Sequence, residues 1–103
     1  MSIEVLLEDE RGNAVSVAVF DAAGIIARSI PDLADVRCSC VRFINPYGDT
    51  VFNTLQAPVL LAEWDRLRAA FEAEGAAGLW ENVRELVARC ADDPHLYVRF
   101  IGD

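Results

Sequence analysis

Several residue types are scarce or missing in this 103-residue chain. It contains no lysine: all nine basic side chains are arginine, and seventeen acidic residues give a formal net charge of −8. A nucleic acid duplex, with one negative charge per ~1.7 Å of its axis, would be repelled overall. The same charge disfavours docking on an anionic membrane surface and permits attraction to a basic protein or a cationic ligand. The lysine-free, alanine-rich composition also indicates a GC-rich bacterial genome.

Long apolar runs are missing as well. Asp21 and Arg28 interrupt the most apolar N-terminal region, so no stretch approaches the ~18 residues of a membrane-spanning helix. The first ten residues carry acids where a signal peptide needs a basic patch and then an apolar block. We therefore expect a soluble, cytoplasmic protein that binds neither nucleic acid nor membrane.

Cysteine and histidine are too few and too poorly spaced for a strong site. The three cysteines are an odd number, and C-x-C at Cys38 and Cys40 is not a usual zinc-knuckle spacing, so free thiols and no metal are expected. Cys90 and His95, the single histidine, are separated by a predicted helix end and Pro94, which disfavours a catalytic dyad. No phosphate-binding loop, metalloprotease motif or nucleophile elbow is present, and neither a catalytic residue nor a cofactor is assigned.

What the chain does contain is enough apolar sequence for one core. Hydrophobic residues make up 53% of the chain, and neither a linker nor a low-complexity tract divides it. Residues 1–103 are therefore predicted to form a single domain. Period-two alternation of apolar side chains predicts roughly five strands, at residues 3–8, 14–20, 36–44, 50–53 and 95–101.

Two amphipathic helices are predicted between the fourth and fifth strands. Pro58 suits a first helical turn, and an apolar stripe then recurs at helical spacing until Gly75. The stripe of the first helix comprises Leu60, Trp64, Leu67 and Phe71, with Glu63 on the exposed arc, and that of the second comprises Leu79, Val83, Leu86 and Cys90. The short connection predicts an αα-hairpin. Residues 21–35 are predicted to be irregular, with one short helical turn.

The predicted fold is thus α+β: a mostly antiparallel sheet of about five strands with the αα-hairpin on one face. "VRFI" occurs at residues 41–44 and again at 98–101. If the helices cover the face that carries Val41 and Phe43, Arg42 and Arg99 share the opposite face with Tyr97.

The turn "INPYGDTVFN" is a candidate site. Asparagine, proline and glycine occupy the first, second and fourth positions of a type I turn at residues 45–48, which predicts a hairpin between the third and fourth strands. Tyr47, Asp49, Thr50 and Asn53 cluster polar groups there and could bind a ligand. The alternative, that these side chains hydrogen-bond their own backbone, is favoured.

The two arginines are a second candidate. Arg42 and Arg99 could clamp a carboxylate or phosphate with Tyr97 as a flat wall. The alternative, which the excess of acid favours, is cross-strand pairing with Glu4 or Glu8.

Two classes of function follow. The favoured one is a non-catalytic protein-interaction module, immunity- or antitoxin-like or self-associating, for which Trp80 at the flank of the second helix is a candidate anchor. The other is a small-molecule-binding protein or enzyme that uses the polar end of the sheet around Tyr47, Asp49 and Asn53 with the arginines. The sequence identifies no particular partner or small molecule.

Overall fold

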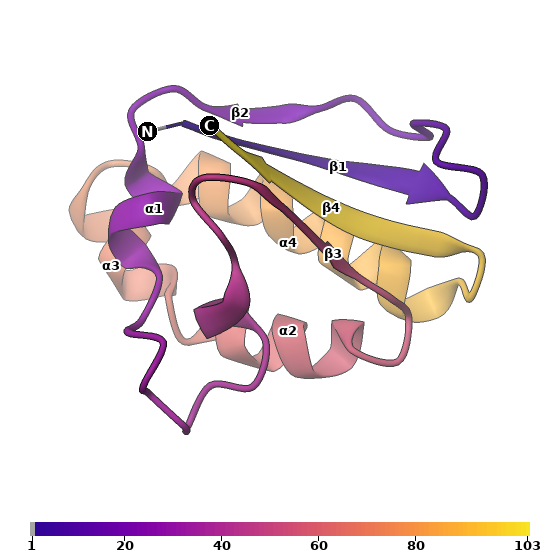
Figure 1. The fold of residues 1–103 in the computed structure, drawn as a ribbon. Helices are drawn as coiled ribbons and strands as arrows, with labels where there is room; N and C mark the ends of the chain where they lie inside the picture. Colours follow the sequence, from indigo (N-terminus) through magenta and orange to yellow (C-terminus); the bar gives the residue numbers. More distant parts are fainter. Residues whose placement is uncertain (1) are drawn as a thin grey trace.

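The computed structural model describes residues 2–103 and has an α+β architecture, in which helices lie against one face of a sheet (Figure 1). The elements are β1 (Ile3–Asp9), β2 (Val19–Asp21), α1 (Ile25–Ser29), the 3₁₀ turn η1 (Val41–Phe43), β3 (Asp49–Phe52), α2 (Ala57–Asp65), α3 (Arg68–Ala73), α4 (Ala77–Asp92) and β4 (Leu96–Gly102). Within the described residues, no helix has both the length and the apolar character needed to cross a bilayer.

The sheet is antiparallel and has the strand order β2-β1-β4-β3. The two central strands, β1 and β4, supply its buried face, because alternate side chains of a strand point the same way. The side chains of Ile3, Val5, Leu7, Val98 and Phe100 are inaccessible to solvent. The predicted strands at 3–8 and 95–101 are therefore confirmed, as is the predicted side of Val98 and Phe100.

The prediction of about five strands is wrong for residues 36–44. This stretch is a loop followed by η1, so the sheet has four strands over residues 2–103. β3 pairs with β4 instead of with the segment before the turn. The predicted strand at 14–20 is regular only at its end, where β2 pairs with β1, and Ala14 makes an isolated bridge to Glu8.

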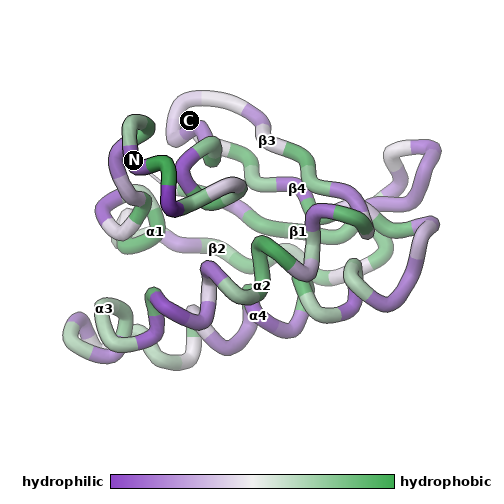
Figure 2. The backbone as a smooth tube through the Cα atoms, turned by 90° about the horizontal axis from the view of Figure 1, so that it is seen from below, coloured by the Kyte–Doolittle hydropathy of each residue, from purple (hydrophilic) through white to green (hydrophobic). Residues whose placement is uncertain are grey.

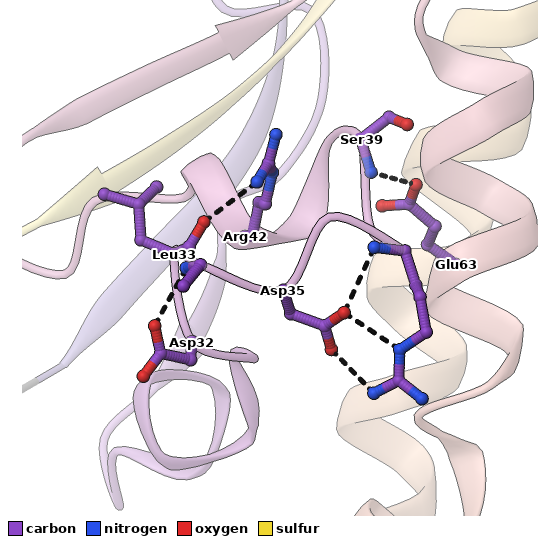
Figure 3. Close-up of polar contacts among 8 residues, drawn as sticks. Asp32, Leu33, Asp35, Ser39, Arg42 and Glu63 are labelled. Atoms are coloured by element: carbon purple, nitrogen blue, oxygen red, sulfur yellow. Dashed lines mark hydrogen bonds and ion pairs between the residues drawn. The ribbon is translucent and has the colours of Figure 1, made fainter.

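A buried carboxylate explains why residues 36–44 do not form a strand. Glu63 of α2 accepts hydrogen bonds from the backbone N–H groups of Ser39 (2.6 Å), Cys40 (3.0 Å) and Val41 (2.9 Å), and Figure 3 shows the first of these. Consecutive N–H groups of a strand point in opposite directions, so three of them can reach one carboxylate only if the chain curls. The predicted exposure of Glu63 is wrong: its side chain is buried.

The helical region contains three helices instead of the predicted pair. The first predicted helix is interrupted at Arg66 and Leu67, which separates α2 from α3, and the αα-hairpin is therefore not formed as predicted. Gly75 follows α3 with a positive φ of 71°, a conformation that glycine adopts without strain. The apolar stripes themselves are confirmed, except that Leu67 and Leu79 are only partly buried. The buried members are Leu60, Trp64, Phe71, Val83, Leu86 and Cys90. Figure 2 shows alternating apolar and hydrophilic segments along α4, as expected for a helix with one buried face.

Two tryptophans join α2 to α4. The indole Nε1–H of Trp64 donates to the Trp80 carbonyl (3.0 Å), and the Nε1–H of Trp80 donates to the Trp64 carbonyl (2.8 Å). Both side chains are buried. Trp80, the predicted interface anchor at the flank of its helix, is thus part of the core, and its polar group is already satisfied within the chain.

Replacing Glu63 with glutamine tests the role assigned to the buried carboxylate. One amide oxygen would remain to accept hydrogen bonds, while the amide NH₂ would face backbone donors, so at least one buried N–H would lose its acceptor. We expect the free energy of unfolding to fall by about 1–3 kcal/mol in urea titrations. The exposed residue Glu85 on α4 provides the matched control, because Glu85→Gln alters the same functional group without a buried partner. Equal stability of the two variants would contradict this role.

Candidate functional site

The turn at residues 45–48 forms as predicted, and its polar side chains make hydrogen bonds with nearby backbone groups. The Gly48 N–H donates to the Asn45 carbonyl (3.3 Å), and the Tyr47 N–H donates to Asn45 Oδ1 (2.9 Å). Thr50 Oγ1 accepts a hydrogen bond from the Asn45 N–H (2.9 Å). The turn is locked to the end of β4, because the Gly102 N–H donates to the Gly48 carbonyl (2.8 Å) and a Cβ at Gly102 would overlap the carbonyl of Pro46.

Asn53 also acts on its own backbone. Its Oδ1 accepts from the N–H groups of Leu55 and Gln56, both at 3.0 Å, and so organises the entry to α2. Tyr47 is exposed on the outside of the turn. Of the predicted polar cluster, Thr50 and Asn53 are thus engaged in local structure, in agreement with the alternative favoured from the sequence.

Arg99 lies on the open face of the sheet between two acids. Its Nε donates to Glu8 (2.8 Å) and its Nη1 donates to Asp49 (2.8 Å). Tyr97 is on the same face, directly opposite Glu8 in the β1–β4 register. Arg99 therefore makes the cross-strand ion pair that the excess of acid predicted, and its charge is balanced within the chain.

The structure separates Arg42 from Arg99. Arg42 belongs to η1 and not to a strand, so the predicted sharing of one sheet face by the two arginines is wrong. Its Nη1 donates to the Leu33 carbonyl (2.9 Å), as Figure 3 shows, and its guanidinium carbon lies 4.6 Å from the centre of the Phe43 ring. The polar residues and arginines predicted to converge at the end of the sheet therefore occupy at least two different surfaces.

Arg42 instead lines a cleft between α1 and η1, which we call the α1–η1 cleft. Its volume is about 520 Å³, within the range typical of ligand-binding clefts. It is lined by Ala27, Ile30, Pro31, Leu33, Arg42, Phe43, Ile44, Asn45 and Pro46. The lining is mostly apolar, and Arg42 is its one charged residue.

Both walls of the α1–η1 cleft are held by buried carboxylates. On one side, Asp21 accepts hydrogen bonds from the Ile25 N–H (2.9 Å) and the Ile26 N–H (2.6 Å) at the start of α1. On the other side, Glu63 holds the residues that lead into η1. A site supported by buried hydrogen bonds keeps its shape better than a free loop does.

The sequence did not reveal this cleft. Leu33 lies in a stretch predicted to be irregular, and Phe43 was predicted to face the core alongside Val41. In the structure Val41 is buried, whereas Phe43 and Leu33 are 50% and 61% exposed. The available signal was the apolar content of "SIPDL" and "RFINP", but sequence periodicity alone cannot bring two irregular segments together.

The cysteines and His95 form no reactive arrangement. Burial raises the pKa of all three thiols, which favours the protonated form over the nucleophilic thiolate. The Cys90 thiol donates to the Leu96 carbonyl (3.4 Å), whereas His95 Nδ1 lies 3.1 Å from Glu10 at the surface. Among residues 2–103, no three His, Cys, Asp or Glu side chains are placed to hold a metal ion.

Comparison of the chain with protein-family models, with curated proteins and with solved structures finds no match. The assignment of function therefore depends on the geometry of the chain itself.

The contact between His95 and Glu10 predicts a shifted titration. The hydrogen bond that His95 Nδ1–H donates to the Glu10 carboxylate raises the pKa of His95 above its ordinary value, since it stabilises the protonated ring. The resulting stabilisation is present below the unfolded-state pKa and is lost as the pH rises through the folded-state pKa. We expect Glu10→Gln to lower the His95 pKa measured by NMR, whereas Glu85→Gln should leave it unchanged. A His95 pKa that is the same in wild type and Glu10→Gln would contradict the contact.

Proposed function

We propose that the protein is a non-catalytic interaction module that docks a partner protein in the α1–η1 cleft. The observation that carries the proposal is the exposure of two large apolar side chains, Leu33 and Phe43, at a concave apolar surface. Burying a leucine or phenylalanine side chain stabilises a complex by about 1.5–3 kcal/mol relative to leaving it in water. Contiguous apolar surface of this kind is typical of interaction sites.

The chemistry of the surrounding residues supports binding over catalysis. The buried thiols are held protonated, and the Glu8–Arg99–Asp49 group on the open sheet face is internally paired. A general acid or base needs a titratable group within reach of the substrate. The α1–η1 cleft offers an arginine and an amide, which can bind and orient but do not exchange protons near neutral pH.

The openness of the cleft favours a protein over a small ligand. A small-molecule site usually covers ~70–90% of its ligand. Here the side chains of Leu33 and Phe43 are at least half exposed, so a small ligand would leave much of their apolar surface in contact with water. A folded partner or an extended peptide would cover the cleft and these two side chains together, as in interfaces where an anchor fills a pocket inside a wider contact.

A second candidate function, self-association, is favoured by the edge strand β2. Val17 and Phe20 are 87% and 68% exposed, and residues 14–20 contain no charged side chain. Edge strands are usually protected by charge or proline, and an unprotected one can pair with a second copy. A groove of about 600 Å³ runs between this segment and α4, where Glu85 and Arg89 could form reciprocal ion pairs across a two-fold axis.

The docking function is tested by Leu33→Asp and Phe43→Asp, each of which places a charge on the apolar surface. We expect either variant to lose the partner captured by the immobilised wild-type protein, with at least a tenfold loss of affinity once that partner is purified. Leu55→Asp is the matched control, because Leu55 is 82% exposed and does not line the cleft. Retention of the partner by both cleft variants would contradict the proposal, provided that circular dichroism shows all three variants folded.

Self-association is tested by Val17→Lys. Position 17 lies two residues before β2, so a lysine there would repel its symmetry mate and disfavour pairing along this edge. If the wild-type protein sediments above the 11.3 kDa monomer, we expect this variant to return to the monomer mass, while Val59→Lys on α2, also at an exposed valine, should not. A monomeric wild-type protein at millimolar concentration would remove this second candidate.

A further inference from the structure

We propose that the α1–η1 cleft recognises the C-terminal end of a polypeptide whose last residue is apolar. Arg42 would bind the terminal carboxylate, and the apolar walls would hold the last side chain. This inference rests on the proposed docking function and specifies the chemistry of the docked group. Three observations support it: the guanidinium of Arg42 forms no ion pair with a carboxylate of the described residues, its position is fixed, and the cleft beside it is apolar.

The charge of Arg42 has no carboxylate partner in the described part of the chain. Only Nη1 makes a hydrogen bond to protein, to the Leu33 carbonyl, and Nε is buried without an acceptor. The neighbouring acids make their hydrogen bonds elsewhere, since Asp32 accepts from the Ala34 N–H (2.8 Å) and Asp35 pairs with Arg37 (2.9 Å), as Figure 3 shows. Arg42 interacts with Asp35 only through the longer-range attraction of their charges. An arginine left unpaired in so acidic a chain is available for an anion from outside.

Arg42 also differs from the other arginines that lack an ion pair over residues 2–103. The side chains of those arginines are exposed, so that water solvates the guanidinium; they are Arg11, Arg66 and Arg89. Arg42 is only partly exposed and stands among apolar groups. A hydrogen bond between two ionised groups is stronger where water is partly excluded. An anion would therefore bind more tightly to Arg42 than to an exposed arginine.

The guanidinium of Arg42 is held in place before any ligand binds. The Leu33 carbonyl fixes one end, and the guanidinium carbon lies over the Phe43 ring, 4.6 Å from its centre. An arginine fixed in this way loses little conformational entropy on binding, and its planar donors match the two oxygens of a carboxylate.

The apolar walls of the cleft indicate which side chain the ligand carries next to its carboxylate. Ile30, Pro31 and Ile44 line the cleft beside Arg42 and offer no hydrogen bond from their side chains. They would hold an aliphatic or aromatic side chain. A C-terminal residue carries its carboxylate and its side chain on the same Cα, so both groups can reach neighbouring points of one cleft. Capture of a terminal carboxylate is an established mode of peptide recognition.

The exposed walls favour a polypeptide over a free organic acid. Leu33 and Phe43 would be covered by the residues that precede the C terminus, whereas a short fatty acid would leave them in water. The net charge of −8 adds a further constraint, since it repels an acidic chain at long range. Basic residues upstream of the terminus would offset this repulsion and speed association.

The experiment uses the peptide N-acetyl-Gly-Arg-Gly-Leu, as the free acid and as the C-terminal amide, titrated into the full chain and followed by NMR. We expect the acid to shift the backbone amide signals of residues 30, 32, 33 and 42–45 and to bind about tenfold more tightly than the amide, because only the acid makes charge-assisted hydrogen bonds. Arg42→Gln should reduce this preference to about twofold or less. Arg66→Gln, which removes an exposed and unpaired arginine, should retain it.

The outcomes separate this inference from the docking function. Equal binding of acid and amide at these signals would overturn the role of the carboxylate and leave apolar docking intact. Absence of binding by both peptides would overturn the C-terminal ligand, while the partner losses expected for Leu33→Asp and Phe43→Asp would still test docking. Octanoate binding as tightly as the peptide acid would identify a free acid as the ligand and overturn the polypeptide assignment. The NMR spectrum of the Arg42→Gln variant, recorded without peptide, should match that of the wild type outside the cleft, which would show that the variant is folded.

Discussion

The carboxylate of Glu63 is the interaction on which the arrangement of the middle of the chain depends. It is buried with no cationic partner among residues 2–103, and three backbone N–H groups supply the hydrogen bonds that offset the loss of water. This contact curls residues 39–41, starts η1 and ties the loop to α2. As a result, Arg42 and Phe43 are turned outward, to the surface where α1 ends, and Val41 is turned into the core.

Two further sets of buried hydrogen bonds connect the segments around the α1–η1 cleft to the helices and the sheet. The reciprocal tryptophan hydrogen bonds hold α2, the helix that carries Glu63, against α4. Asp21 fixes the start of α1 in the same manner, with a buried carboxylate that accepts from backbone N–H groups. The α1–η1 cleft is thus formed by two irregular segments, but each of them is anchored to a regular element. An apolar surface on such rigid support can remain exposed without collapsing.

The helices and strands that could be predicted from the sequence are those whose buried residues recur at a regular spacing. The alternation around Val98 and Phe100 identified β4, and the spacing of Leu60, Trp64 and Phe71 identified the buried side of α2 and α3. Residues 36–44 have an equally good strand pattern, but a carboxylate more than twenty residues away determines their conformation. Because the candidate cleft depends on that distant contact, the sequence indicated Arg42 as a binding residue but gave it the wrong neighbours.

The position of β4 has a consequence for how the molecule assembles. This strand lies between β1 and β3, although about forty residues and three helices separate it from β3 along the chain. During synthesis, β1 and β3 have no shared neighbour until β4 emerges from the ribosome, so the pairing that unites both halves of the sheet is the last to become available. Until then β1 lacks its central partner strand, so the buried face of the sheet is completed only after all the helices have been synthesised.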